Sequence, residues 1–135
     1  MQQQPSPYGN DMRLSEKQQI FTLNIAKLIA KAAELGIGLT FGDAFRHKDL
    51  QYLYYHGLTF EADQLVRTRR KTKTMNSMHL RRLAVDFNFF INNKLTYKKE
   101  DLQELGDYWE SLNKNNRWGG NFKTFLDTPH FEMRG

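Results

Sequence analysis

The chain has 135 residues, which fits a single domain, and its 39% hydrophobic and 13% aromatic content supplies enough apolar surface for a core. There is no cysteine, which excludes disulfide scaffolds, zinc ribbons and thiol nucleophiles, so any metal must be bound by His, Asp or Glu. The formal net charge of +5 favours an anionic partner, such as nucleic acid, a membrane surface or a cell wall that carries phosphate polymers.

The N-terminal segment, residues 1–13, is rich in Gln, Pro, Asn and Gly, and we predict a flexible arm there, followed by one domain over residues 14–135. The segment has no apolar stretch, so it is neither a signal peptide nor a transmembrane span. A site of action outside the cytoplasm would therefore require another factor to deliver the protein.

The first predicted helix begins at Ser15, because Ser15 and Gln18 have the spacing of a capping box. Gly36 is expected to end this helix in the left-handed conformation. Between them, apolar residues recur at helical spacing and predict one buried face: Phe21, Ile25, Leu28, Ala32 and Leu35.

The next segments are shorter. Residues 37–44 read as a short strand, and residues 47–55 as a second helix. Residues 57–74 are less regular and are expected to form an exposed loop with a strongly basic part made of Arg67, Arg69, Arg70, Lys71 and Lys73.

The clearest strand covers residues 83–91, where apolar and polar side chains alternate and place Asp86 on the polar face. Asn92-Asn93 predicts a turn into a hairpin partner at 94–97. Residues 100–112 favour a helix, 113–120 are polar and Gly-rich, and 131–133 favour a last strand. These elements predict an α+β fold with a central, mainly antiparallel sheet flanked by helices.

Three fragments carry chemically active side chains: Ser77 to His79, Ala84 to Phe87, and Asp127 to Glu132. A catalytic zinc typically takes three protein ligands and leaves a fourth position for water. His79 and Asp86 would lie about 23 Å apart on one straight strand, so the chain must fold back between them for both to bind one ion. We place that turn at Arg81-Arg82.

Hydrolysis also requires a base that is not itself a metal ligand. Asp127 lies three residues before His130, and Pro129 disfavours an uninterrupted helix, so a bent loop could bring both side chains into one cleft. From the residues alone other interpretations stay open. A lone histidine beside an apolar strand is more often structural than a ligand, and Asp127 with His130 is equally compatible with a turn cap.

Taken together, the fragments resemble one family. The pattern Ser-x-His, six residues, Asp, and much later an acidic residue, two others and His, is similar to the zinc D-Ala-D-Ala carboxypeptidases and L-alanyl-D-glutamate endopeptidases, peptidase family M-fifteen, with the hedgehog/DD-peptidase fold. The resemblance runs from about Leu14 to Glu132 and includes Trp118-Gly119-Gly120. Many members have a Gly where this chain has Leu80 to Leu83, which puts details of the substrate in doubt.

The resemblance implies a role for individual residues. It makes His79, Asp86 and His130 the zinc ligands and Asp127 the catalytic base. It also places Arg46 where family members carry an Arg that stabilises the oxyanion or holds a substrate carboxylate, with an ion pair to Asp43 or Asp49 as the alternative. Three further residues are expected to support the site or contact the substrate: Gln51, Ser77, which would orient a neighbouring ligand or the substrate, and Trp118, at the floor of the cleft.

The implied activity is zinc-dependent hydrolysis of peptidoglycan stem peptides. The compact form resembles bacteriophage and prophage members, which favours an L-alanyl-D-glutamate endopeptidase acting as an endolysin; a D-Ala-D-Ala carboxypeptidase is the alternative. We expect a monomer, made in the bacterial cytoplasm and released to the cell wall with the help of another factor. The basic loop is expected to attract anionic cell-wall polymers.

Two rival interpretations remain. The basic run from Arg67 to Arg82 would suit a nucleic-acid-binding module, but the sequence has no helix-turn-helix, RNA-binding strand motif or zinc finger. A binding protein without catalysis is disfavoured because the whole ligand set and Asp127 are present. His47 and His56 are expected to be ordinary surface or packing residues.

Overall fold

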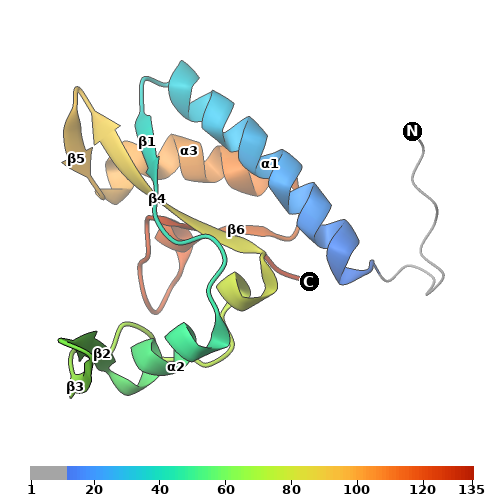
Figure 1. Ribbon diagram of the computed structural model, residues 1–135. Coiled ribbons are helices and arrows are strands. Elements are labelled where there is room, and N and C mark those ends of the chain that lie inside the picture. Colours follow the sequence, from blue (N-terminus) through green and yellow to red (C-terminus); the bar gives the residue numbers. More distant parts are fainter. Residues whose placement is uncertain (1–11) are drawn as a thin grey trace.

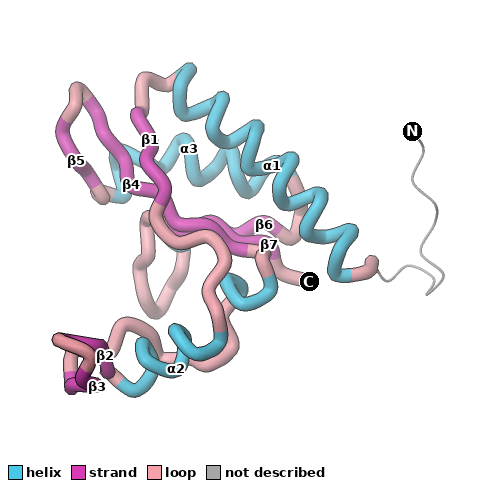
Figure 2. Tube along the Cα trace, viewed as in Figure 1, coloured by secondary structure: helices cyan, strands magenta, loops and turns pink. Residues whose placement is uncertain are grey.

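The computed structural model describes residues 12–135, so most of the predicted N-terminal arm lies outside the described residues. Helices and strands alternate along the chain (Figures 1 and 2). In chain order the elements are α1 (Leu14–Glu34), β1 (Gly38–Phe41), α2 (Lys48–His56), β2 (Leu58–Glu61), β3 (Gln64–Arg67), the 3₁₀ helix η1 (Met78–Arg81), β4 (Ala84–Ile91), β5 (Lys94–Thr96), α3 (Lys99–Leu112), β6 (Asn116–Trp118), the 3₁₀ helix η2 (Gly119–Asn121) and β7 (His130–Met133).

The main sheet has five strands in the order β1-β4-β7-β6, with β5 also paired to β4, and every pairing is antiparallel. A separate antiparallel pair, β2–β3, follows α2. Figure 1 shows α2 and this hairpin away from α1 and α3. The predicted α+β fold with a mainly antiparallel sheet is thus confirmed.

The core lies between the apolar face of the sheet and the helices α1 and α3. Along β4 the side chains of Val85, Phe87 and Phe89 are buried, whereas Asp86 points to the other face. Trp109 of α3 joins the two layers, because its ring contacts both Phe21 of α1 and Phe131 of β7 edge to face. One face of β4 therefore builds the core and leaves the other face for a site.

The predicted start of the first helix was wrong in detail. Ser15 lies inside α1, and the cap is two residues earlier, at Arg13, whose backbone N–H donates to Glu16 Oε2 at 3.3 Å. Gln18 instead donates its side-chain N–H to the carbonyl of Arg81 at 2.8 Å, which ties α1 to the segment before β4. The predicted helix stop is confirmed, since Gly36 is left-handed with φ of 75°.

The prediction of an irregular loop over 57–74 was wrong in its first half, which forms the β2–β3 hairpin. Its two turn residues, Ala62 and Asp63, both have positive φ, of 47° and 63°. Turns with positive φ are normally indicated by Asn or Gly in the sequence. Asn92-Asn93 is an example, and the turn predicted there is confirmed. Ala62 gives no such signal. The short strand β6, at Asn116–Trp118, was missed as well.

No helix within residues 12–135 combines the length and the apolar character needed to cross a membrane.

Candidate metal centre

Three elements bring His79, Asp86 and His130 together. His79 lies in η1, Asp86 lies on β4, and His130 is the first residue of β7. The β4–β7 register makes Asp86 and His130 direct partners across the sheet. The chain folds back between η1 and β4 through Arg82, which is left-handed with φ of 58° and donates its N–H to the carbonyl of His79. The turn predicted at Arg81-Arg82 is therefore confirmed.

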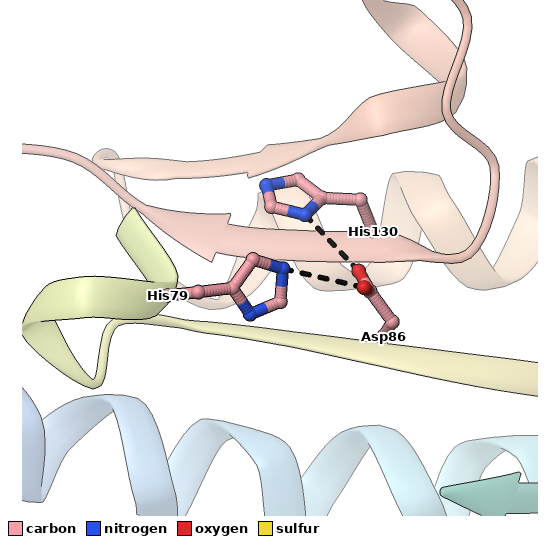
Figure 3. A group of neighbouring side chains, drawn as sticks. All are labelled: His79, Asp86 and His130. Atoms are coloured by element: carbon pink, nitrogen blue, oxygen red, sulfur yellow. Dashed lines mark hydrogen bonds and ion pairs between the residues drawn. The ribbon is translucent and has the colours of Figure 1, made fainter. Parts of the chain in front are cut away.

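The donor atoms of these three side chains converge (Figure 3): one ligand atom from each lies within 4.8 Å of the others. His79 Nε2 is 3.3 Å from Asp86 Oδ2, and His130 Nδ1 is 3.1 Å from Asp86 Oδ1. Both imidazoles are buried, and the Asp86 side chain is 23% exposed. Ligands bound at about 2 Å to one zinc ion stand roughly 3–4 Å apart. The two contacts of Asp86, at 3.3 and 3.1 Å, match this spacing, and the widest separation in the group, within 4.8 Å, is somewhat larger.

A second contact on each imidazole fixes which ring nitrogen is available. His79 Nδ1 lies 2.8 Å from the carbonyl oxygen of Ala44, and a carbonyl can only accept, so Nδ1 carries the hydrogen and Nε2 keeps its lone pair. His130 Nε2 lies 2.6 Å from Glu132 Oε1, an acceptor that leaves Nδ1 for a metal. Metal-binding histidines usually have such a partner on the far nitrogen. The residues present therefore fit a metal ion.

The charges of the metal-free centre are strongly coupled. Burial would lower the pKa of His130, but hydrogen bonds with Asp86 and Glu132 outweigh it and raise the pKa to about 9. Burial would raise the pKa of Asp86, but hydrogen bonds with His130 and His79 hold it well below its usual value. The pKa of Glu132 is lowered by His130 and Arg134 against the effect of burial. The centre thus holds two ionised carboxylates around a protonated imidazole, whose proton a metal would displace.

Asp127 lies at the end of the loop between η2 and β7 and lines the same cleft as the three residues. Its backbone N–H donates to the carbonyl of Gly119 at 2.9 Å, and its own carbonyl accepts from the N–H of His130 at 3.1 Å. A side chain at Gly119 would collide with the Asp127 carbonyl, so this close approach requires glycine. Burial raises the pKa of Asp127, although the charge of His130 opposes the shift. A carboxyl group in this setting is suited to exchanging protons.

Arg46 approaches the centre from the segment before α2. Its guanidinium donates to Asp43 at 2.8 Å and to Gln51 at 3.0 Å, and it lies 3.9 Å from Asp86 Oδ2. The ion pair with Asp43 considered from the sequence is therefore present. Gln51 is fully buried and donates to the carbonyl of Thr74 at 2.6 Å. Arg46 and Gln51 thus form a buried bridge from the centre to the loop after β3.

The cleft that contains these groups has a volume of about 1390 Å³. It is lined by the three residues and Asp127, by Tyr54 and the loop after β3, and by Phe122 and Phe125 of the loop before β7. The cleft exceeds the roughly 300–1,000 Å³ typical of small-ligand pockets, so it has room for several residues of an extended chain.

Comparison with known proteins agrees with this geometry. Residues 70–133 match the model of a family described as D-alanyl-D-alanine carboxypeptidase. This stretch is a little under half of the chain and contains the whole candidate centre together with Asp127. Over residues 70–133 the chain is therefore similar to this family of peptidases. This similarity supports a hydrolase.

The fold has a solved relative that extends the comparison to the rest of the chain. The L-Ala D-Glu endopeptidase ChiX of Serratia marcescens is similar with a TM-score of 0.61, covering 97% of this chain and 96% of that chain at 14% sequence identity. At this identity the likeness shows the fold, including the segment before residue 70 that the family match does not cover. No curated protein matches the chain.

Two other predicted site residues, Ser77 and Trp118, contact segments next to the centre. Ser77 caps η1, since its Oγ accepts from the backbone N–H of His79 at 3.2 Å. Trp118 is fully buried and stacks on Phe131, so it lies beneath the cleft, within the core. Its indole N–H donates to the carbonyl of Thr128 at 2.8 Å and so supports the loop between Asp127 and His130.

The remaining histidines lie elsewhere. His47 caps α2 by accepting from the N–H of Asp49, and His56 packs against the rings of Tyr52 and Tyr55. Among residues 12–135, the only group that could hold a metal is the one at His79, Asp86 and His130. This agrees with the expectation that the other two histidines have ordinary roles.

Sequence reasoning assigned no role to Glu132, the partner of His130. Part of a signal was available: Glu132 follows His130 by two residues, and on β7 both side chains face the same way. The predicted strand, 131–133, began one residue too late to include His130. The carbonyl of Ala44 was also missed, and no sequence signal could have found it, because any residue supplies a carbonyl. Arg134, which pairs with Glu132 at 2.5 Å, completes this supporting set.

Proposed function

We propose that this protein is a zinc-dependent peptidase that hydrolyses stem peptides of bacterial peptidoglycan. The observation that carries the proposal is the convergence of two imidazoles and one carboxylate, with each imidazole oriented by an acceptor on its far nitrogen. Two neutral histidines and one carboxylate are a common ligand set of catalytic zinc and leave a coordination position open. His79, Asp86 and His130 would hold the ion.

When bound, the zinc ion supplies the Lewis acidity that activates water and polarises the scissile carbonyl. Asp127 acts as the general base: it takes a proton from the attacking water and returns it to the departing amine. Its partly buried carboxyl, with a raised pKa, suits both transfers. Arg46 provides a fixed positive charge beside the centre, held by Asp43 and Gln51, where negative charge develops on the carbonyl oxygen.

Within this class we propose an endopeptidase that cuts between L-Ala and D-Glu. The similar fold of ChiX, an L-Ala D-Glu endopeptidase, supports this choice, and so does a cleft long enough for residues on both sides of the bond. The second candidate is a D-Ala-D-Ala carboxypeptidase, which is favoured by the description of the matching family. Release to the wall by another factor, in a phage or prophage setting, stays a prediction.

Digestion of a defined muropeptide, followed by mass spectrometry, tests the proposal. The substrate carries the full stem peptide, and the reactions contain enzyme with zinc, enzyme with a chelator, and enzyme to which zinc is restored. We expect loss of L-Ala from the remaining peptide, abolished by the chelator and recovered with zinc. Release of terminal D-Ala alone would establish the carboxypeptidase instead. An intact muropeptide in every reaction would contradict a peptidoglycan peptidase.

A further inference from the structure

Four cationic side chains line the same cleft as the metal centre and come from one short segment. Arg69, Arg70, Lys71 and Lys73, which we call the basic wall, follow β3 and face the cleft together with Thr72. None of the four forms an ion pair with a carboxylate of residues 12–135. The wall therefore brings positive charge to the cleft that the described protein does not neutralise.

The other cationic side chains that line the cleft already form ion pairs with carboxylates of the protein. Arg46 pairs with Asp43, and Arg134 pairs with Glu132. The carboxylates of Asp86 and Asp127 belong to the reaction centre. No carboxylate at the cleft among the described residues pairs with the basic wall, which leaves its cations available to an anionic group of a bound molecule.

Aromatic rings and backbone contacts hold the wall in place. The guanidinium of Arg70 lies 4.8 Å from the ring of Tyr55, whose carbonyl accepts from Arg70 Nε at 2.8 Å. Lys71 Nζ lies 5.1 Å from the ring of Tyr54, and its backbone N–H donates to the Tyr54 carbonyl at 3.0 Å. These contacts orient the cations without neutralising them, which lowers the entropic cost of binding an anion.

The wall is also joined to the reaction centre. The guanidinium of Arg46 lies 4.8 Å from the centre of the Tyr54 ring, the same ring that Lys71 contacts. Arg46 also lies 3.9 Å from Asp86. Lys73 Nζ of the wall lies 6.0 Å from the ring of Phe125, which belongs to the loop before β7 and also lines the cleft. A chain that crosses the centre would therefore run from it along the basic wall, with an aromatic surface opposite.

We propose that the basic wall binds carboxylates that the peptide substrate carries away from the scissile bond, so that the enzyme selects acidic peptides. This inference rests on the proposed function and names the chemical class of its substrate. An anionic polymer is the less favoured ligand, because the wall faces the cleft, whereas Arg67, Arg81 and Arg82 lie outside its lining. Arginine and lysine donate charge-assisted hydrogen bonds that suit carboxylates.

Two versions of one stem tripeptide, blocked at the N-terminus, provide the test. One keeps its free carboxylates, and in the other they are amidated. We expect the amidated peptide to have a KM at least about tenfold higher with similar kcat. The double variant Arg69→Gln/Lys71→Gln should lose this preference, while the control Arg67→Gln, which removes a nearby cation of β3, should keep it. Equal KM values for the two peptides, or a preference that survives in the double variant, would overturn the inference.

Binding of the same peptides by calorimetry separates this inference from the proposed function. If neither peptide is cleaved, the proposed function fails, but tighter binding of the acidic peptide that disappears in the double variant would still support the wall. If both are cleaved and bound equally, the wall has no such role and the peptidase stands. Polyphosphate is the polymer probe. Polyphosphate could bind more tightly than the acidic peptide, with its binding weakened equally by Arg67→Gln and by the double variant. In that case the wall is part of a general polyanion surface and the inference is wrong.

Discussion

The metal centre and the basic wall line one cleft but are built in different ways. The centre lies on β4, β7 and η1, its two imidazoles are buried, and each makes a second fixed contact. The wall lies on an irregular segment and its cations are exposed, two of which, Arg70 and Lys71, contact tyrosine rings. The sheet register thus places the groups that we propose to act on the bond, whereas a loop places the groups that we propose to contact the rest of the substrate.

This difference separates the expected effects of mutation. Changes in the centre should affect zinc and turnover, because the groups there act on the reacting atoms or on the metal. Changes in the wall should affect KM, because those groups contact the substrate away from the bond. The following predictions test this division, from the largest effect to the smallest.

The largest effect is expected from removing a ligand. His79→Ala or His130→Ala should abolish tight zinc binding and reduce peptide hydrolysis to the background rate, since two ligands do not hold a catalytic zinc. Zinc content after dialysis and the rate of muropeptide cleavage measure both effects. His56→Ala is the matched control and should retain zinc and activity. A ligand variant that keeps zinc and near-normal turnover would remove the basis of the centre.

Asp127→Asn should retain zinc but lower kcat by about 10²–10⁴-fold, because the amide cannot accept the proton. Zinc content, kcat and KM are compared with the parent enzyme under the same conditions. A variant that loses zinc would place Asp127 among the ligands instead. Near-normal kcat would show that another group is the base.

Glu132→Gln should weaken zinc binding by about 10–100-fold, since the amide no longer provides a negative partner for the far nitrogen of His130. Competition with a chromophoric chelator measures the affinity. At saturating zinc, most of the turnover should return, which distinguishes a supporting residue from a base. Unchanged zinc affinity would mean that the contact with His130 has no part in metal binding.

The smallest effect concerns pH. The pKa of His130 in the metal-free protein is raised to about 9, so below that pH zinc must displace a proton from this imidazole. The apparent zinc affinity should therefore rise with pH, by up to about tenfold per unit, and level off near pH 9. Calorimetry in buffers of different ionisation enthalpy should show proton release at pH 7. Zinc binding without proton release would contradict the coupling between His130, Asp86 and Glu132.

Much of the fold and of the centre could be predicted from the sequence because both depend on periodic patterns. The alternation along β4 placed Asp86 opposite the core, and the turn needed between His79 and Asp86 was correctly located at Arg81-Arg82. The β2–β3 hairpin was missed because Ala62 adopts a turn conformation that its residue type does not indicate. Side-chain patterns report on strand faces, but they do not report on unusual backbone conformations.

The supporting contacts of the site were harder to predict because they depend on tertiary geometry. The carbonyl of Ala44 orients His79, and only the folded chain shows that the two meet across 35 residues. The indole of Trp118 supports the loop before His130 from within the core, a role that composition alone could not separate from lining the cleft. The sequence and its family resemblance thus named the candidate ligands, while the structure was needed to show what orients them.

X-ray absorption at the zinc edge of the purified protein, loaded with one equivalent of zinc, tests the central claim most directly. The account predicts a four-coordinate site with two imidazole nitrogens at about 2.0–2.1 Å and oxygen ligands at about 2.0–2.2 Å. His79→Ala, which should no longer hold zinc tightly, should lose the two-imidazole signal. A spectrum without imidazole scattering, or one unchanged in that variant, would show that the ion does not bind at this triad.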